Sequence, residues 1–373
     1  MHIIIIGTAY PYRGGLAAYN ERLAREYQRQ GHEVEIMTFT LQYPQFLFPG
    51  NTQYSSEQRP TDLKITRCIN SVNPLTWIST GRKIKRKAPD KVIFCYWMAF
   101  MAPCFSSIAR NARNGKTKMI GLIHNMIPHE PTVLDKLFPR SFVDAMDGFV
   151  AMAESVVADI NSFDRYMKPK AVSPHPIYDH YGEKVDRSLA AMRLGLHEEN
   201  HYILFFGFIR QYKGLDLLLE AFSDQRLREF PIKLIIAGEF YENPGMYLQL
   251  IHKYKLDQLV ELRTRFIADK EVKNYFSVAD IVAQPYRSAT QSGVSQIAYH
   301  FENPMLVTDV GGLAETVPHQ KVGYVVDVDP KQIADALVDF FANNRSAEFV
   351  SHIKEEKKKY AWSKMTETID SLS

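Results

Sequence analysis

The stretch QPYRSATQSGVSQIAYHFENPMLVTDVGGLAET, residues 284–316, carries the pattern that decides the fold. A polar loop over residues 288–293 runs into an apolar helix, which is expected to begin near Val294 and to stop at Asn303-Pro304 before the strand MLVTDV. A small-residue loop that opens a helix leaves backbone N–H groups unpaired at the positive end of the helix dipole. The sequence therefore predicts an anion site at this helix start.

The composition indicates a globular protein with room for two domains. The chain has 373 residues, of which 46% are hydrophobic and 23% charged, and this balance argues against a disordered chain. A net charge of +3 does not favour a dedicated nucleic-acid binder. Three cysteines, Cys68, Cys95 and Cys104, lack metal-ligand spacing, so buried thiols in a reducing compartment are favoured.

The apolar runs are short. Four consecutive isoleucines in MHIIIIG are too few for a signal sequence or a membrane span and fit a buried strand. No other apolar run approaches 18 residues, so we expect a cytoplasmic protein, soluble or peripheral at the inner face of the membrane.

The N-terminal half begins as a doubly wound α/β domain. After the isoleucine strand and Gly7 come a helical pattern (Leu16, Tyr19, Leu23, Tyr27), a stop at Gly31 and the strand VEIMT. The glycines at the helix start are Gly14 and Gly15, without a G-x-G-x-x-G pattern, so nicotinamide or flavin binding is poorly supported. This pair suits either helix packing or contact with a phosphate or sugar.

Polar residues follow the strand MIGLI. They are His124, Asn125, His129 and Glu130, and ligands of open α/β sheets collect beyond such strand ends. A lone histidine is more often structural, but four polar groups at one strand end favour a site. The spacing HNMIPH lacks the helical pair and third ligand of a zinc site.

Three further segments of the first half stand out. Residues 41–59 are proline-punctuated without a clear period and predict a long surface loop. Residues 73–87 predict a helix whose basic end is either a solvated helix terminus, which is slightly favoured, or a contact with an anionic membrane surface, through Arg82, Lys83, Lys85, Arg86 and Lys87. The stretch AVSPHPIYDHYG, residues 171–182, is the expected linker.

The second half repeats the α/β pattern. In FGFIRQYKG, Arg210 and Lys213 lie in the loop after the first strand of this half, opposite the helix start at residues 291–294. Two cations placed there would clamp a pyrophosphate through charge-assisted hydrogen bonds. They would also stabilise the charge that develops on a departing diphosphate.

These residues resemble those of retaining glycosyltransferases of the GT-B fold, family 4 type, over nearly the whole chain. The resemblance is carried by YPYRGGLAAYNERLA, HNMIPHEP, FGFIRQYKGLDLLLEAF, ADIVAQPYRSATQSGV and NPMLVTDVGGLAETV. It implies two Rossmann-like domains facing a central cleft: an acceptor-side domain over residues 1–175, a nucleotide-sugar donor domain over 176–355, and a C-terminal helix over 356–373 that crosses back to the first domain.

The resemblance also implies roles for individual residues. His124 would lie beside the transferred sugar, and Gly14 and Gly15 would approach the donor phosphate or the acceptor. Arg210 and Lys213, following Gly207, would hold the diphosphate. The nucleobase would be contacted at Arg265, Phe266 and Ile267, largely through backbone. No metal ion or cofactor is implied.

Two positions depart from the family pattern. Two glutamates, eight positions apart, usually contact the sugar and ribose, and Ala289 and Ile297 stand at these positions here. The arginine of the clamp is also displaced, because Phe208 directly follows Gly207. The TQSG loop resembles that of a subgroup of these enzymes. We therefore expect the donor to be recognised by the loop and helix start, at Gln291, Ser292, Gly293 and Val294, together with the carboxylate of Glu315.

The function predicted from these features is transfer of a hexose from a nucleotide-diphosphate sugar to a glycan or lipid-linked acceptor, in cell-surface polysaccharide synthesis. The alternatives are a sugar-nucleotide epimerase or phosphorylase on the same fold, and a non-catalytic nucleotide-sugar-binding protein, which the missing glutamates suggest.

Overall fold

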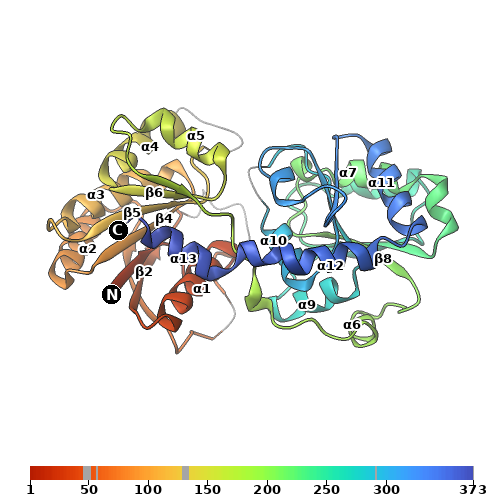
Figure 1. The fold of residues 1–373 in the computed structure, drawn as a ribbon, viewed down its shortest axis with the longest axis horizontal. Helices are drawn as coiled ribbons and strands as arrows, with labels where there is room; N and C mark the ends of the chain where they lie inside the picture. Colours follow the sequence, from red (N-terminus) through yellow and green to blue (C-terminus); the bar gives the residue numbers. More distant parts are fainter. Residues whose placement is uncertain (45–51, 56–57, 128–133, 290–291, 373) are drawn as a thin grey trace. The chain divides into compact units, whose positions relative to one another are not determined.

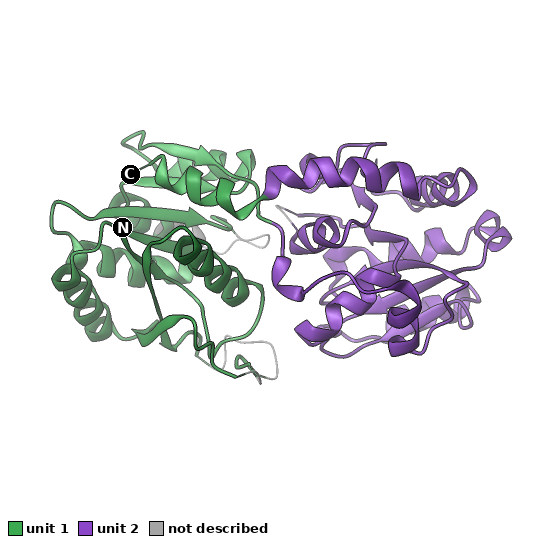
Figure 2. Ribbon diagram, turned by 60° about the horizontal axis from the view of Figure 1, so that its bottom comes forward, with its two compact units in different colours: residues 1–176, 361–373 green, residues 177–360 purple. Residues whose placement is uncertain are grey.

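The computed structural model describes residues 1–372 except 45–51, 56–57, 128–133 and 290–291. The chain forms two compact units: residues 1–176 with 361–373, and residues 177–360 (Figure 2). The boundaries predicted from the sequence were 175/176 and 355/356. Each unit is described by itself, and the expected cleft between them stays a prediction.

Unit 1 is a seven-stranded parallel sheet in the order β3-β2-β1-β4-β5-β6-β7, flanked by helices (Figure 1). Its elements are β1 (His2–Ile6), α1 (Gly15–Arg29), β2 (Glu33–Leu41), β3 (Lys64–Asn70), α2 (Pro74–Lys87), β4 (Lys91–Tyr96), η2 (Ala99–Met101), α3 (Ala102–Ala112), β5 (Lys118–Ile123), α4 (Leu134–Ala145), β6 (Gly148–Ala151), α5 (Glu154–Phe163), β7 (Lys170–Val172) and α13 (Trp362–Asp370).

Unit 2 is a six-stranded parallel sheet in the order β10-β9-β8-β11-β12-β13. Its elements are η3 (Asp179–Tyr181), α6 (Arg187–Leu194), β8 (His201–Phe206), η4 (Gln211–Lys213), α7 (Leu215–Phe222), η5 (Gln225–Glu229), β9 (Ile232–Ala237), α8 (Gly245–Lys253), β10 (Val260–Arg263), α9 (Asp269–Val278), β11 (Ile281–Gln284), α10 (Gly293–Phe301), β12 (Met305–Thr308), η6 (Ala314–Thr316), β13 (Gly323–Val326), α11 (Pro330–Ala342), α12 (Ser346–Glu356) and η7 (Lys357–Tyr360).

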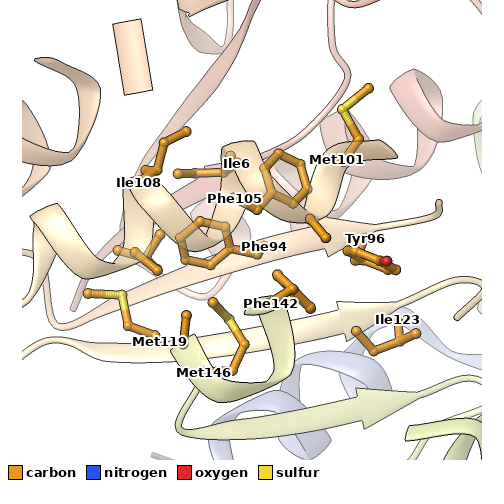
Figure 3. Packing of buried hydrophobic residues seen from close by; sticks show 14 of the residues in the cluster. Ile6, Phe94, Tyr96, Met101, Phe105, Ile108, Met119, Ile123, Phe142 and Met146 are labelled. Atoms are coloured by element: carbon orange, nitrogen blue, oxygen red, sulfur yellow. The ribbon is translucent and has the colours of Figure 1, made fainter. Parts of the chain in front are cut away.

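The central strands are buried on both faces because helices cover the sheet on both sides. The isoleucines of β1 are fully buried, as the unbroken apolar run predicted. On one face of the sheet, aromatic residues of β4 pack against Phe105 of α3 and Phe142 of α4 (Figure 3). In both sheets, strands are added first on one side of the first strand (β1 or β8) and then on its other side. Ligands of such sheets bind at the point where the strand order switches in this way.

Local sequence signals account for several helix ends. Asn73 caps the predicted helix α2 by accepting a hydrogen bond from the Leu75 N–H, and Ser292 caps α10 by accepting one from the Val294 N–H. Helix α10 ends at Phe301, with Glu302 in the left-handed conformation, just before Asn303-Pro304 as the sequence predicted. None of the helices in the described part of the chain is long and apolar enough to cross a membrane.

The structure corrects three details. The basic C-terminal segment is not one helix, because η7 ends at Tyr360 and α13 begins at Trp362, with Ala361 extended between them. The chain changes unit at this point: Tyr360 packs on Tyr299 in unit 2, whereas Trp362 packs on Tyr19 in unit 1.

The other two corrections concern strands. The edge strand β3 was not predicted, because charged and polar residues of its sequence KITRCIN interrupt the apolar pattern. The short strand β7 includes Ala171 and Val172, the first two residues of the expected linker.

Candidate functional site

The helix start predicted near Val294 lies in unit 2 beside the loop that follows β8. Helix α10 begins at Gly293, and Val294 in its first turn is close to Gly207, since a Cβ built on Gly207 would lie 3.8 Å from a Val294 methyl carbon. The same Cβ position lies 3.0 Å from Lys213 Nζ. Gly207 has φ +98°, which favours glycine, and its bare Cα leaves room for the lysine amine.

Lys213 is a buried cation without a paired carboxylate in the part of the chain that the structure describes. The residue is 8% exposed, and none of the carboxylates that the structure describes forms an ion pair with its amine. Burial, and secondarily the nearby Arg210 guanidinium, lower the pKa of Lys213 to about 8. An amine held in this way gains from the arrival of an anion, because the anion supplies the missing counter-charge.

Two tyrosines orient the cations. The Lys213 amine lies 5.5 Å from the centre of the Tyr286 ring, and the Arg210 guanidinium lies 4.7 Å from the centre of the Tyr241 ring. Both distances are in the range of a cation–π interaction. Tyr241 and Tyr286 were not predicted from the sequence, because no spacing rule marks either of them.

The loops that follow β8 and β11 are tied together. Arg287 makes two hydrogen bonds to the Asp216 carboxylate, of 2.7 and 2.6 Å, and its backbone N–H donates to the Tyr212 carbonyl. Gly214 lies so close to Pro285 that a Cβ on it would be 1.9 Å from the Pro285 carbonyl oxygen. The positions of Lys213 and of residues 285–287 after β11 are therefore fixed relative to each other.

The other predicted residues of unit 2 follow β10 and β12, at the same carboxyl end of the parallel sheet. Arg265, Phe266 and Ile267 come after β10, where the Arg265 guanidinium is paired with Glu271 at 2.8 Å and Ile267 is buried. Glu315 is exposed on η6, after β12. Gln291 lies outside the described residues.

The two positions without the family's glutamates are buried. Ala289 is in the loop before α10 and Ile297 in the second turn of α10, and both are buried. A carboxylate at Ile297 would need a partner or a different backbone position. The absence of this glutamate is therefore built into the packing of α10.

In unit 1, the predicted residues lie at the carboxyl ends of β1 and β5. Gly14 and Gly15 are exposed at the start of α1, where Gly14 is the N-cap residue with φ 105°. His124 follows β5, and its ring makes an edge contact with Tyr19 of α1 at 4.6 Å. His129 and Glu130 lie outside the described residues.

His124 is held as a neutral imidazole. Burial, with a smaller effect of the nearby His175, lowers the pKa of His124 to about 3. Its Nε2 is inaccessible to solvent and has no hydrogen-bond partner among the described residues. Thr8 Oγ1, Asn20 Oδ1 and Asn125 Oδ1 are likewise inaccessible and without a partner among the described residues. Of these three residues, only Asn125 was predicted from the sequence to lie at a site. Unpaired buried polar atoms are costly, so each of these atoms calls for a partner such as a buried water molecule or a ligand atom.

Within the described ranges, no group of three or more His, Cys, Asp or Glu side chains is placed to hold a metal ion.

The chain is similar to known proteins, in part of its length or over nearly all of it. Residues 200–343 match the family model for glycosyl transferases of group 1. A D-inositol 3-phosphate glycosyltransferase from Nocardioides is 31% identical over 166 residues, which cover 41% of this chain and 36% of that protein. The matched part of the chain thus spans little more than a third of that relative.

Other similarities span nearly the whole chain. A GDP-mannose-dependent alpha-(1-6)-phosphatidylinositol monomannoside mannosyltransferase from Mycobacterium tuberculosis is 24% identical over 92% of this chain and 90% of that protein. The structure of sucrose-phosphate synthase from Thermosynechococcus elongatus superposes with a TM-score of 0.75 at 15% identity, over 100% of this chain and 98% of that one. The predicted fold, two Rossmann-like α/β domains of the GT-B type, is confirmed.

Proposed function

We propose that this chain is a glycosyltransferase that moves a hexose from a nucleotide-diphosphate sugar to a glycan or lipid-linked acceptor. The observation that carries the proposal is Lys213, a buried amine without a paired carboxylate in the described structure, beside Gly207 and the first turn of α10. A diphosphate would satisfy both this amine and the N–H groups at the helix start. The family model over residues 200–343 and the GDP-mannose-dependent relative support this choice of donor.

The proposed reaction retains the anomeric configuration. Arg210 and Lys213 would take up the charge that develops on the departing diphosphate, and a leaving phosphate oxygen would accept the proton of the acceptor hydroxyl on the same face of the sugar. His124, neutral because of its low pKa, would offer a hydrogen bond to a sugar hydroxyl and would not act as a strong base. This mechanism requires no metal ion, and activity that persists in the presence of a chelator is expected.

The test is Lys213→Ala in the full chain, with Lys270→Ala, an exposed lysine of α9, as the matched control. We expect release of nucleoside diphosphate from a panel of uridine and guanosine diphosphate sugars to fall by about 100-fold or more, since an electrostatic donor to the leaving group is typically worth this much. The control should retain its activity. A Lys213→Ala variant that keeps most of its turnover, with an unchanged fold by circular dichroism, would contradict the proposal.

The buried Ala289 and Ile297 favour one alternative, a protein that binds a nucleotide sugar without transferring the sugar. Calorimetry would then detect nucleotide-sugar binding that depends on Lys213, but no acceptor would cause nucleotide release. An epimerase or phosphorylase would instead act on the nucleotide sugar regardless of a supplied acceptor.

We also propose that the protein works at the inner face of a membrane, in polysaccharide synthesis. At the start of α2, Val72 and Leu75 are 49% and 75% exposed, and Arg82, Lys85 and Arg86 are exposed further along the same helix. Lys87 contributes less, because it is paired with Glu35 at 2.7 Å. Sedimentation with phosphatidylglycerol vesicles, which Arg82→Gln with Arg86→Gln should weaken, tests this contact.

A further inference from the structure

Unit 1 contains a cavity of about 320 Å³ that the proposed donor site does not use. It is lined by Tyr10, Pro11, Arg59, Ile65 and Arg67. Tyr10 and Pro11 belong to the loop between β1 and α1, which also carries Gly14, whereas Ile65 and Arg67 belong to the edge strand β3. The cavity therefore joins the loop beyond the carboxyl end of β1 to one edge of the sheet.

Both arginines at this cavity are held by backbone carbonyls. Arg59 Nη2 donates to the Ile65 carbonyl at 3.0 Å. Arg67 Nε donates to the Phe39 carbonyl at 3.2 Å, and its Nη2 to the Thr40 carbonyl at 3.3 Å. Carbonyl oxygens orient a guanidinium without neutralising its charge.

The charge of these arginines is uncompensated among the residues that the structure describes, since none of the carboxylates there pairs with Arg59 or Arg67. Arg25, on the neighbouring helix α1, differs in this respect because it is paired with Asp62 at 2.6 Å. Two oriented cations, both exposed to solvent, thus line one open cavity, and donor positions of both remain unused by the carbonyls.

The remaining walls are largely apolar. Ile65 is buried, and Pro11 and the Tyr10 side chain complete the lining. Arg67 is in register with Thr38, near the carboxyl end of β2, and its hydrogen bonds reach the two residues beyond. Ligands of doubly wound sheets bind beyond the carboxyl ends of the strands, where Tyr10 and Pro11 follow β1, and an apolar wall beside a few convergent polar groups is typical of an organic ligand site.

We propose that this cavity binds a phosphate or carboxylate group of the acceptor, and that the acceptor is therefore an anionic molecule. The planar guanidinium forms paired hydrogen bonds with either oxyanion, which explains the use of arginine in place of lysine here. That the anion belongs to an acceptor rests on the proposed function, but the anion site itself does not.

The test uses the full chain with Lys213→Met, so that the cation of the proposed donor site is absent. Binding of glucose 6-phosphate and of glucose is measured by calorimetry. We expect glucose 6-phosphate to bind more tightly than glucose, and Arg67→Gln to weaken it by roughly tenfold or more, the usual worth of a charge-assisted hydrogen bond. Arg59→Gln should also weaken the binding of glucose 6-phosphate. Arg67→Lys keeps the charge but loses the paired N–H donors of the guanidinium, so its affinity should lie between those of the wild type and Arg67→Gln.

Arg110→Gln is the control, since Arg110 is an exposed arginine of unit 1 outside the cavity whose Nη2 also donates to a backbone carbonyl, that of Ser141. Equal binding of the two sugars, or equal losses in the Arg67→Gln and Arg110→Gln variants, would mean an adventitious ion only and would overturn the proposal. Arg59→Gln keeps the test decisive if Arg67→Gln fails to fold.

Two further measurements separate the possible causes. Nucleotide-sugar binding is measured with Lys213 intact: if no nucleotide sugar binds but the dependence on Arg67 persists, the proposed function fails and the anion site stands. Vesicles with and without phosphatidylglycerol identify the source of the anion. Arg67-dependent binding to the anionic vesicles indicates a lipid headgroup, and dependence confined to the soluble sugar phosphate indicates a glycan.

Discussion

At the scale of single residues, the buried cation Lys213 of the proposed donor site has a cost in stability. Its amine is buried beside Gly207, and its pKa is lowered to about 8 by burial and by Arg210. A lysine in the unfolded chain keeps a pKa near ~10.4. The folded chain therefore binds protons less tightly than the unfolded chain, and the charged lysine destabilises the fold until an anion arrives.

We predict that Lys213→Met stabilises the ligand-free protein, by on the order of 1 kcal/mol or more at pH 7, because it removes a buried charge and keeps the volume. The gain should be fully present below about pH 8 and should fade as the pH rises beyond that value, where the wild-type amine is neutral. Urea unfolding at pH 7 and pH 10 measures it.

The control for this prediction is Lys270→Met, an exposed lysine, which should change the free energy of unfolding by less than about 0.5 kcal/mol at either pH. A Lys213→Met variant that is less stable than the wild type at pH 7 would show that the protein satisfies the amine within the fold.

The sequence identified the cations but not what positions them. Arg210 and Lys213 stand out because two cations follow an apolar strand and precede a helix, a pattern that is local in the chain. Tyr241 and Tyr286 touch these cations from other loops, and the Arg287–Asp216 pair joins residues 71 positions apart. Such contacts depend on how strands are ordered in the sheet, which spacing along the chain does not reveal.

At the scale of elements, α10 carries Ile297 where the glycosyltransferases that the chain resembles carry a glutamate. Ile297 is buried, so a carboxylate at this position would lose its hydration. The sequence alone predicted this helix and its start from apolar spacing, but apolar spacing did not tell which positions face the ligand.

We predict that Ile297→Glu destabilises the protein by about 2–5 kcal/mol, through the loss of buried apolar surface and the burial of a carboxyl group, and does not increase activity. Ile297→Val, the matched control, should cost about 0.5–1.5 kcal/mol. Denaturant midpoints of both variants measure the effect. A stable, more active Ile297→Glu variant would mean that position 297 can face the donor after all.

Helix α13 illustrates how an element distant in sequence supports a site. Tyr19 packs against Trp362 of α13 at 4.9 Å, against His175 at 4.9 Å and against His124 at 4.6 Å. The indole of Trp362 is also buried and lies next to the Arg22 guanidinium. Trp362 thus acts on His124 through the Tyr19 ring.

We predict that Trp362→Ala costs about 3–5 kcal/mol of stability and lowers turnover at a temperature where the variant is still folded, because the Tyr19 ring loses its support. Donor affinity should stay unchanged, since Trp362 belongs to unit 1 and the donor cations to unit 2. Trp362→Phe should recover most of both properties. Loss of stability with full turnover, measured by calorimetry and initial rates, would reduce Trp362 to a packing role.

At the scale of the whole molecule, the sequence pattern predicted two successive α/β domains, but it did not show that the C-terminal segment returns to the first of them. Two successions of apolar strands and helices give two sheets with the same relative strand order. The return of the C-terminus to unit 1 was expected only from the resemblance, because the segment KKKYAWSKMTETI has a helical pattern with no sign of its partner. The break at Ala361 was not predicted either, because alanine favours a helix, whereas the Ala361 backbone is extended between η7 and α13.

The C-terminal return depends on a buried charge, which makes it testable. Lys91 at the start of β4 is 1% exposed and pairs with Asp370 at the end of α13 at 2.5 Å, and the Tyr27 hydroxyl of α1 donates to the same carboxylate oxygen at 3.0 Å. One carboxylate thus joins the last helix to the first helix and a central strand.

We predict that Asp370→Ala destabilises the protein by about 2–4 kcal/mol, because it removes the carboxylate that pairs with a buried ammonium. Asp335→Ala removes an equally direct pair with Arg226, but this pair is exposed and should contribute less than about 1 kcal/mol. Urea unfolding compares the two variants, and hydrogen exchange of α13 should rise in Asp370→Ala alone. Equal stability losses in both variants would mean that packing by α13, rather than its buried ion pair, holds the C-terminus to unit 1.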